Sequence, residues 1–194
     1  MLTPENLHPY QQRAVIHQCT HPASMLWLDI GLGKTSITLT SIAHLVKTGF
    51  LRAVVVVAPI RVCRLVWRQE AAKWSHLGAL TFSMVMGTKD QRVRALLRPA
   101  SIYIINYENL EWLSENLHTY FVRKGLPVPF DGIVFDEVDK MKNSSTNRVR
   151  ALKKVLEQFK WSTGLTGTPA SEGYKDLHGQ YLVVDKGERL GTSK

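Results

Sequence analysis

The sequence lacks a long hydrophobic run and any recognisable targeting segment. Its longest apolar stretch, residues 53–60, falls far short of the about 20 residues that a membrane-spanning helix needs. The first residues do not contain a basic region followed by an apolar core, as a secretion signal would. We therefore expect an intracellular, cytoplasmic and soluble protein that has no membrane partner.

Cysteine is scarce, and the two cysteines stand far apart. Cys19 and Cys63 form neither a Cys-x-x-Cys pair nor part of a tight Cys/His cluster of the kind that binds zinc. We expect both thiols to be reduced, and we expect no structural zinc site.

Acidic residues are outnumbered by basic ones. The chain has 25 Lys and Arg against 16 Asp and Glu, giving a formal net charge of +9 and a pI near 9.7. Such a charge indicates a polyanionic partner, of which nucleic acid is the obvious candidate, although it says nothing about the fold. Much of the excess lies in residues 61–73, 89–98 and 140–160 and not in a detachable basic tail.

The length of 194 residues and the apolar content of 44% allow one substantial core, so we expect residues 1–194 to form a single domain. Predicted strands alternate with predicted helices, which is typical of an α/β fold. The β-branched run 52–59 suits an interior parallel strand that is covered on both faces. Further strands are predicted at 80–86, 101–105, 133–137 and within 161–170. Helices are predicted at 7–19, 61–74, 89–97, from 106, from 143 or 145 to 159, and at 176–184.

Residues 26–35, Leu-Trp-Leu-Asp-Ile-Gly-Leu-Gly-Lys-Thr, pass from an apolar run into a glycine-containing turn. Gly31 and Gly33 allow successive backbone N–H groups to point into one concavity, where they can bind phosphate. Lys34 adds a positive charge, and Thr35 can place its hydroxyl on Mg²⁺. The apolar spacing that follows predicts a helix whose positive N-terminal end faces the phosphates.

The match to the P-loop pattern is incomplete, because the pattern has a glycine where this chain has Leu28. An ordinary Gly-Lys-Thr surface turn is the alternative. The predicted strand before the turn and the helix after it favour nucleotide binding.

Asp136 and Glu137 follow the apolar strand 133–135 directly. Two adjacent carboxylates are costly if they are buried without partners, but they suit a site next to Mg²⁺. Asp136 would hold the ion through its water shell, and Glu137 would polarise the water that attacks a γ-phosphate. The alternative is a strand that ends in solvent with two exposed acids.

Gln11 lies near the start of the first predicted helix. Its amide offers a donor and an acceptor that can pair with the N6 and N7 edge of adenine, which would favour ATP. Taken by itself, it is more consistent with a solvated helix residue.

Taken together and in order, these motifs resemble the first RecA-like lobe of a superfamily 2 helicase of the Swi/Snf-like type, including its phage and bacterial relatives. The resemblance covers nearly the whole chain and rests on Tyr-Gln near the start, Leu-Asp-Ile-Gly-Leu-Gly-Lys-Thr, Val-Val-Val-Ala-Pro, Ile-Asn-Tyr-Glu, Phe-Asp-Glu-Val-Asp and Leu-Thr-Gly-Thr-Pro. It implies a three-layer P-loop domain with a mainly parallel central sheet flanked by helices. It also implies ATP and Mg²⁺ as cofactors.

The resemblance assigns a role to each motif of this chain. The implied nucleotide-binding residues are Gln11, Gly31, Leu32, Gly33, Lys34, Thr35 and Ser36, and the implied catalytic residues are Lys34, Asp136 and Glu137, with Thr35 and Asp136 at the metal. The implied nucleic-acid contacts and coupling residues are Pro59, Arg61, Asn106, Tyr107, Thr166, Gly167 and Thr168. We expect DNA more than RNA as the partner. The motif resemblance itself does not distinguish DNA from RNA, or strand separation from movement along a duplex.

Two features depart from the family pattern. Asp139 stands where the Swi/Snf-like branch usually has His, which leaves the branch open without affecting Asp136 or Glu137. Only a short segment follows Pro169, so we expect the second helicase lobe to be absent from these 194 residues. In the family this lobe supplies arginine fingers. In related phosphoryl-transfer enzymes an arginine finger can increase the catalytic rate about 10³- to 10⁵-fold. We therefore expect feeble ATP hydrolysis, with a second lobe or a partner protein as the missing component.

Two other classes of function remain open. One is a non-enzymatic single lobe that binds nucleic acid or a protein partner. The other is a P-loop kinase, against which stand the Thr-Gly-Thr-Pro motif and the lack of an evident lid for an acceptor substrate.

Overall fold

The central element is a parallel β-sheet, which the computed structural model describes together with its flanking helices over residues 1–170 and 173–192. Within this range the sheet has six strands in the order β1-β6-β5-β2-β4-β3, and every pairing is parallel. The strands are β1 (Ala23–Trp27), β2 (Val54–Ala58), β3 (Phe82–Met84), β4 (Ile102–Asn106), β5 (Gly132–Asp136) and β6 (Trp161–Thr166).

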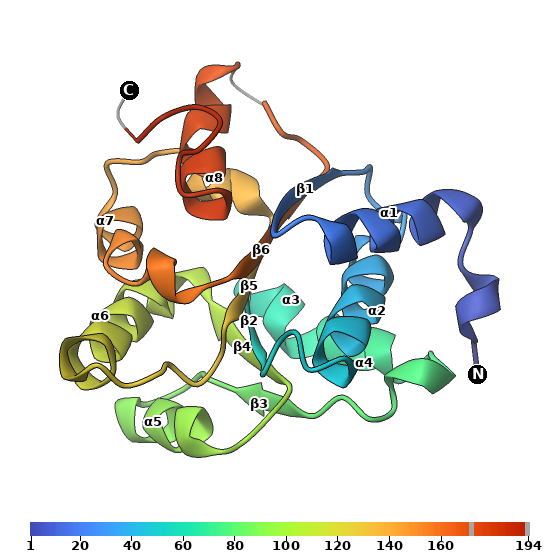
Figure 1. The fold of residues 1–194 in the computed structure, drawn as a ribbon, viewed down its shortest axis with the longest axis horizontal. Coiled ribbons are helices and arrows are strands. Elements are labelled where there is room, and N and C mark those ends of the chain that lie inside the picture. Colours follow the sequence, from blue (N-terminus) through green and yellow to red (C-terminus); the bar gives the residue numbers. More distant parts are fainter. Residues whose placement is uncertain (171–172, 193–194) are drawn as a thin grey trace.

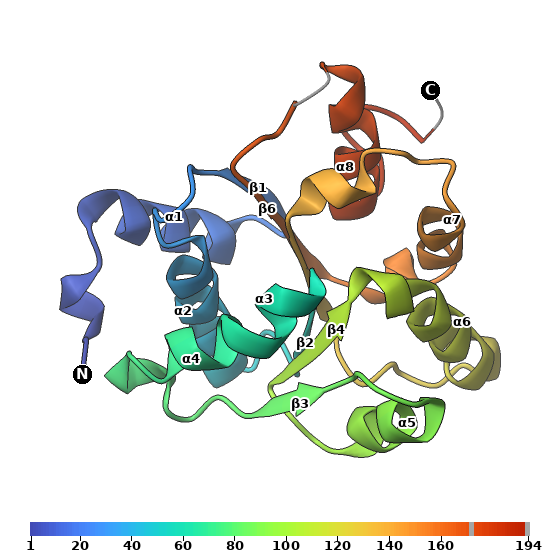
Figure 2. The same ribbon diagram turned by 180° about the vertical axis from the view of Figure 1, so that it is seen from behind.

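Helices cover both faces of the sheet, as the two opposite views show (Figures 1 and 2). On one side lie α1 (Pro9–Thr20), α2 (Lys34–Lys47), α3 (Ile60–Leu65) and α4 (Trp67–Ala71), and on the other α5 (Lys89–Leu97), α6 (Leu110–Tyr120), α7 (Asn147–Lys153) and α8 (Lys175–Val184). Single 3₁₀ turns at Pro4–Asn6, Ser75–Leu77, Tyr107–Asn109, Val122–Lys124, Val138–Met141 and Leu156–Gln158 complete the connections. The predicted three-layer α/β fold is confirmed.

The interior strand was predictable because of its composition. All residues of β2 are fully buried, and alternate residues enter separate apolar clusters on the two faces of the sheet. Val55 and Val57 face α6 and α7, whereas Val54 and Val56 face α2 and α4. A strand that is covered on both faces needs apolar side chains at every position, which explains the continuous valine run.

Several predicted boundaries differ from the observed ones. The helix predicted over 61–74 breaks at Val66 into α3 and α4, and the strand predicted over 80–86 has ladder pairing only at Phe82–Met84. The helix predicted from 143 or 145 begins at Asn147 and ends at Lys153, and a 3₁₀ turn follows. These differences arise because tertiary packing decides where a short element stops, which apolar periodicity does not specify.

The register of the parallel strands places three chain segments at one edge of the sheet. Trp27 pairs with Thr166, and Asp136 pairs with Leu165, so the carboxyl ends of β1, β6 and β5 are neighbours. In open parallel sheets, ligands bind outside the carboxyl ends of the strands.

None of the helices in the described part of the chain combines the length and apolar character that crossing a bilayer requires.

Candidate nucleotide-binding and catalytic site

The glycine-containing loop connects β1 to α2 and contains two left-handed residues. Gly31 has φ 86° and Gly33 has φ 78°, a region that disfavours any residue with a Cβ. Gly33 is also the N-cap of α2. A Cβ at Gly33 would lie 2.3 Å from Nε2 of Gln11 and 2.9 Å from Oγ of Ser36. The loop therefore requires glycine at this position for both its backbone conformation and its packing.

Lys34 begins α2, and its ammonium group lies over the loop. Its Nζ donates hydrogen bonds to the carbonyl oxygens of Leu28 at 2.6 Å and Asp29 at 3.0 Å. The carbonyl groups of the loop thus hold the positive charge close to the start of α2, where backbone N–H groups at a helix N-terminus favour an anion.

Asp136 ends β5 and is buried. Its carboxylate Oδ2 accepts a hydrogen bond of 2.9 Å from the indole N–H of Trp67, which is itself fully buried. The pKa of Asp136 is raised to about 6, chiefly by burial and to a smaller extent by the charge of Glu137, while the Trp67 hydrogen bond and the charge of Lys34 oppose the rise. The carboxylate is thus desolvated, and its ionised form is favoured by any cation that approaches.

Glu137 directly follows β5 and adopts a left-handed conformation with φ 57°. Its side chain is about half exposed and lies 3.7 Å from Nζ of Lys140. The two adjacent acids therefore differ: Asp136 is buried and hydrogen-bonded, whereas Glu137 reaches solvent at the cavity. Both acids line the cavity, so the pair does not match the alternative of a strand end with two acids exposed to solvent.

Gln11 lies in α1 and is buried against the glycine-containing loop. Its Oε1 accepts a hydrogen bond from the backbone N–H of His8 (2.9 Å), and its Nε2 donates to the carbonyl oxygen of Leu32 (3.3 Å). The hydroxyl of Tyr10 donates to the same Leu32 oxygen at 3.1 Å. Gln11 is therefore not a solvated helix residue, and its role in reading adenine stays a prediction.

The end of β6 is tied to the turn that follows β5. The hydroxyl of Thr166 donates to Oδ1 of Asp139 at 3.2 Å, and the backbone N–H of Thr168 donates to Oγ1 of Thr166 at 3.0 Å. Gly167 lies close to the glycine-containing loop, since a Cβ there would be 3.4 Å from the carbonyl oxygen of Leu28. The strand ends and the loop thus form one connected wall.

A single cavity of about 1150 Å³ unites these segments. Of the residues singled out in the sequence, it is lined by Gln11, Gly31, Gly33, Lys34, Thr35, Ser36, Asp136, Glu137, Thr166, Gly167 and Thr168. Five others lie outside its wall: Leu32, Pro59, Arg61, Asn106 and Tyr107. Pro59 is the N-cap of α3, and Arg61 is exposed on that helix.

Asn106 and Tyr107 differ from the expectation that they contact a nucleic-acid strand. Their side chains are only 5% and 2% exposed, so neither presents a surface in this conformation. The Tyr107 hydroxyl donates instead to the carbonyl oxygens of Asp136 (2.9 Å) and Glu137 (3.2 Å). Burial also raises the pKa of Tyr107 well above its usual value. Asn106 is the last residue of β4, and its side chain makes no cap hydrogen bond to the 3₁₀ turn that follows, so the helix predicted from 106 begins only at Leu110.

Sequence reasoning missed two parts of this site. Trp67 lies within the helix predicted over 61–74 and has no predicted role in the site, but its indole N–H reaches Asp136. A signal was present, since a buried tryptophan N–H needs an acceptor. The outer wall, which includes Leu2, Glu70 and Trp74, was also missed. It forms because Leu2 lies opposite Trp74 in a parallel β-bridge, in which the Leu2 N–H donates to the carbonyl oxygen of Lys73 and the Leu2 carbonyl accepts from the N–H of Ser75. The sequence does not reveal this long-range contact.

The fold and the cavity together define a class of protein: a RecA-like P-loop α/β domain whose cavity lies at the carboxyl ends of parallel strands. The family model for the SNF2-related domain matches residues 10–187. The chain belongs to the SNF2-related domain family, which confirms the resemblance drawn from its motifs.

Sequence relatives agree with this assignment. Putative protein p41 of Acyrthosiphon pisum secondary endosymbiont phage 1 is 37% identical over 95% of this chain. The SWI/SNF-related matrix-associated actin-dependent regulator of chromatin subfamily A-like protein 1 of Bos taurus is 30% identical over 92% of it. The chain spans 40% of the length of the first relative and 17% of the second.

Solved structures agree as well. The SWI2/SNF2 ATPase core of Sulfolobus solfataricus in complex with dsDNA superposes with a TM-score of 0.75 at 25% identity, covering 94% of this chain and 36% of that one. The UvsW helicase of bacteriophage T4 superposes with a TM-score of 0.65 at 13% identity, covering 92% of this chain and 57% of that one. The latter similarity concerns the fold alone.

Proposed function

We propose that this chain is the nucleotide-binding lobe of an ATP-dependent DNA helicase or translocase, which binds Mg-ATP and contacts nucleic acid. The observation that carries the proposal is the convergence of Lys34, Thr35, Asp136 and Glu137 on one cavity. These residues come from two distant parts of the sequence. If residues 31–35 formed only a surface turn and Asp136 and Glu137 only a solvent-exposed strand end, nothing would require both segments to line the same cavity.

The residues fit a triphosphate and Mg²⁺. Lys34 and the N-terminal end of α2 supply positive charge for the β- and γ-phosphates. Thr35 and Asp136 supply the oxygen donors that Mg²⁺ prefers. The described residues contain no cluster of three His, Cys, Asp or Glu that could hold a metal, in keeping with an ion that shares its shell with phosphate oxygens and water. When bound, the ion would neutralise charge on the phosphates.

Glu137 is the residue that we assign to water activation. It lines the cavity next to Asp136 and its side chain is about half exposed, so a water molecule can reach it. A carboxylate in this position can orient and polarise the attacking water. We also assign the reading of the adenine edge to Gln11, whose amide is held between His8 and Leu32 at the cavity.

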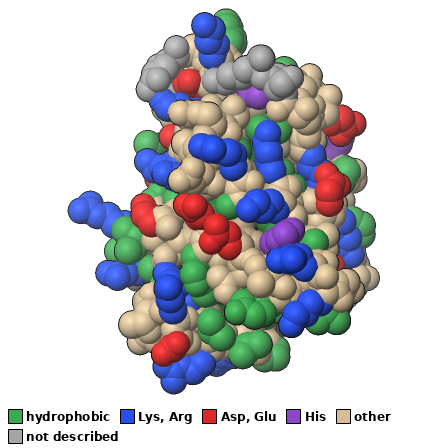
Figure 3. Space-filling model, turned by 90° about the vertical axis from the view of Figure 1, so that its left-hand side faces the viewer, with side chains coloured by type: hydrophobic (Ala, Val, Ile, Leu, Met, Phe, Trp, Pro, Cys, Tyr) green, Lys and Arg blue, Asp and Glu red, His purple; other side chains and the backbone are tan. Residues whose placement is uncertain are grey.

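Duplex DNA is the nucleic acid that we propose, because the similar Sulfolobus core is described in complex with dsDNA. Arg61, Arg64 and Arg68 are exposed along α3 and α4, and they provide cations for phosphate contacts. The side of the molecule that carries α5, α6 and α7 also shows many Lys and Arg side chains, with acidic side chains between them (Figure 3).

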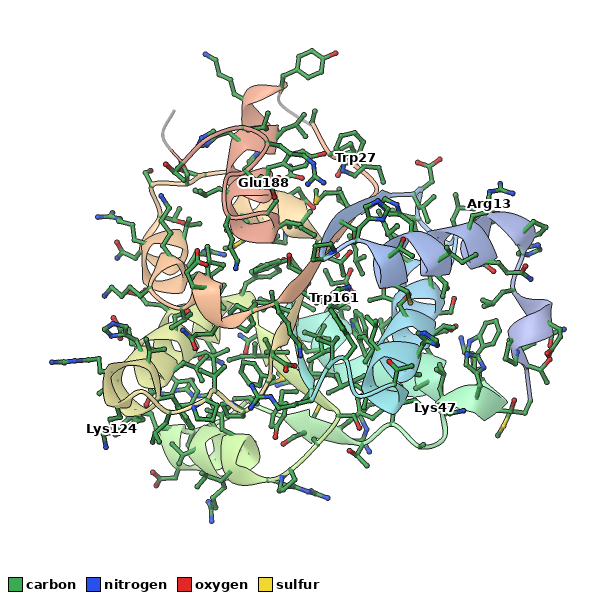
Figure 4. All side chains as sticks on the ribbon, in the orientation of Figure 1. Arg13, Trp27, Lys47, Lys124, Trp161 and Glu188 are labelled. Carbon is green, nitrogen blue, oxygen red and sulfur yellow. The ribbon has the colours of Figure 1, made fainter. Side chains whose placement is uncertain are left out.

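Loss of nucleotide binding in Lys34→Ala is the direct test. We expect a fluorescent ATP analogue to bind the 194-residue chain in the presence of Mg²⁺, and we expect Lys34→Ala to weaken this binding at least about tenfold, because a charge-assisted contact of about 1.5–3 kcal/mol is lost. Lys47→Ala at the other end of α2 is the control (Figure 4). Equal binding by the Lys34 variant and the parent chain would refute the proposal.

Turnover separates an enzyme lobe from a pure binding module. We expect slow ATP hydrolysis from residues 1–194 in isolation, because the resemblance implies that a second lobe supplies the arginine fingers. Glu137→Gln should abolish this residual phosphate release and leave nucleotide binding within about twofold. Phosphate release that is unchanged in the Glu137 variant would refute the role assigned to Glu137. Intact nucleotide binding by the parent chain with no phosphate release above a protein-free control would instead favour a lobe that binds nucleotide without hydrolysing it.

A further inference from the structure

The carboxylate assigned to the metal is held by one aromatic side chain. Asp136 Oδ2 accepts the indole N–H of Trp67 at 2.9 Å, and both side chains are buried. Trp67 comes from α4, on the helical layer that packs against the opposite side of the sheet from α6. The two residues are far apart in the sequence, so this hydrogen bond depends on the correct docking of α4 onto the sheet.

The hydrogen bond constrains the carboxylate in a specific way. The indole ring has one hydrogen-bond donor, its N–H, and no acceptor. It can therefore only donate to an acceptor such as a carboxylate oxygen. The Trp67 ring has no exposed area and packs in the apolar cluster that includes α2 and β2, which fixes its position. A carboxylate accepts about four hydrogen bonds, so one bond to the indole sets its orientation and still leaves acceptor capacity for the water shell of a cation.

We infer that Trp67 is a positioning residue that orients the Asp136 carboxylate for Mg²⁺ and so sets the magnesium affinity of the nucleotide complex. The inference rests on the proposed function and extends it to a residue outside the predicted motifs. Partners that orient a metal-binding carboxylate or imidazole contribute about 10–100-fold to metal affinity. Trp67 does not line the cavity, so its effect passes through Asp136.

Trp67→Phe removes the N–H and keeps an aromatic ring. The experiment measures binding of a fluorescent ATP analogue to the 194-residue chain during a MgCl₂ titration, and also in EDTA. We expect Trp67→Phe to raise the half-saturating Mg²⁺ concentration about tenfold, with metal-free nucleotide binding within about twofold of the parent chain.

Trp161 provides a matched control. It is also fully buried, lies in the interior of the molecule (Figure 4), and donates its indole N–H at 2.8 Å, but to the backbone carbonyl of Gln18. Trp161→Phe therefore makes the same chemical change away from the carboxylates. An equal shift of the Mg²⁺ midpoint in both variants would show general loosening and overturn the inference.

Two further measurements keep the test decisive if Trp67→Phe folds poorly. Benzothienylalanine at position 67 preserves the size of the ring and lacks the N–H, and it should produce the same Mg²⁺ shift. In an Asp136→Asn background the Trp67 substitution should cause no further shift, because residues that act through one contact are not additive. A full additional shift in that background, or no shift with benzothienylalanine, would overturn the inference. If Lys34→Ala leaves nucleotide binding intact, the proposed function itself fails.

Discussion

Gly33 illustrates how one residue serves both backbone and packing. Its φ of 78° is available to alanine only at a cost of roughly 1–2 kcal/mol, and an added Cβ would collide with the Gln11 amide. Gly49 offers a direct comparison, because it has a similar φ of 74° and open space where a Cβ would be.

We expect Gly33→Ala and Gly49→Ala to lose similar unfolding free energy from backbone strain, about 1–2 kcal/mol each. Only Gly33→Ala should also weaken nucleotide binding, because it displaces Gln11 from the loop. Chemical denaturation and nucleotide titration of both variants measure the two effects. Unimpaired nucleotide binding by Gly33→Ala would show that the contact between Gln11 and the loop has no role in the site.

Trp67 and Tyr107 show a common pattern at the residue scale. Both are buried aromatic residues whose polar hydrogen reaches the end of β5, one at the Asp136 carboxylate and the other at the carbonyl oxygens of Asp136 and Glu137. Tyr107 thereby holds the backbone of Glu137, which has φ 57°. The two catalytic candidates are thus fixed from both helical layers.

At the scale of elements, Asp131 fastens the start of β5 to two other segments. Its carboxylate accepts hydrogen bonds from the backbone N–H and Nε of Arg52, before β2, and it lies 3.2 Å from Nζ of Lys160, before β6. Burial alone would raise its pKa, but the hydrogen bonds from Arg52 and Lys160 lower it overall. One buried carboxylate therefore aligns three neighbouring strands at their amino ends.

We expect Asp131→Asn to lose about 1–2 kcal/mol of unfolding free energy at pH 7, a modest figure because Arg52 and Lys160 are half exposed. A carboxylate with a lowered pKa stabilises the fold above its unfolded-state pKa of about 3.9 and loses this contribution as the pH falls through its folded-state pKa. The difference between the variant and the parent chain should therefore shrink below about pH 4.

Urea denaturation at pH 7 and pH 3.5 measures this dependence. Glu157→Gln is the control, because Glu157 pairs with Lys186 but is 80% exposed and should contribute little at either pH. A difference between Asp131→Asn and the parent chain that is the same at both pH values would contradict the assigned role.

At the scale of the whole molecule, the excess of positive charge should govern nucleic-acid binding. Each phosphate contact adds about 0.9 to the negative slope of log affinity against log salt concentration on duplex DNA. We expect binding of a short DNA duplex to fall steeply between low and moderate salt and to survive Lys34→Ala. Arg61→Ala should reduce the slope by about 1, whereas Arg13→Ala, on α1, should leave it unchanged. Salt-independent binding would contradict this account.

The sequence alone was sufficient to predict the α/β class, the buried interior strand and three of the segments that line the cavity: the glycine-containing loop, the Asp136–Glu137 pair and residues 166–168. It did so because those features are local: an apolar run, left-handed glycines and paired acids carry their physical requirements in a few consecutive residues. The motifs also sufficed to place the chain in its family, and the helix predicted at 89–97 has the observed bounds of α5.

The packing of the helical layers on the sheet settled which polar groups pair with one another. It broke the predicted helix at Val66, joined Leu2 to Trp74, buried Tyr107 and brought the Trp67 N–H to Asp136. These outcomes depend on the docking of one layer against another, where the free energy of burying an apolar surface competes with the cost of an unpaired polar group. That competition is settled between residues distant in sequence, so no local pattern records its result.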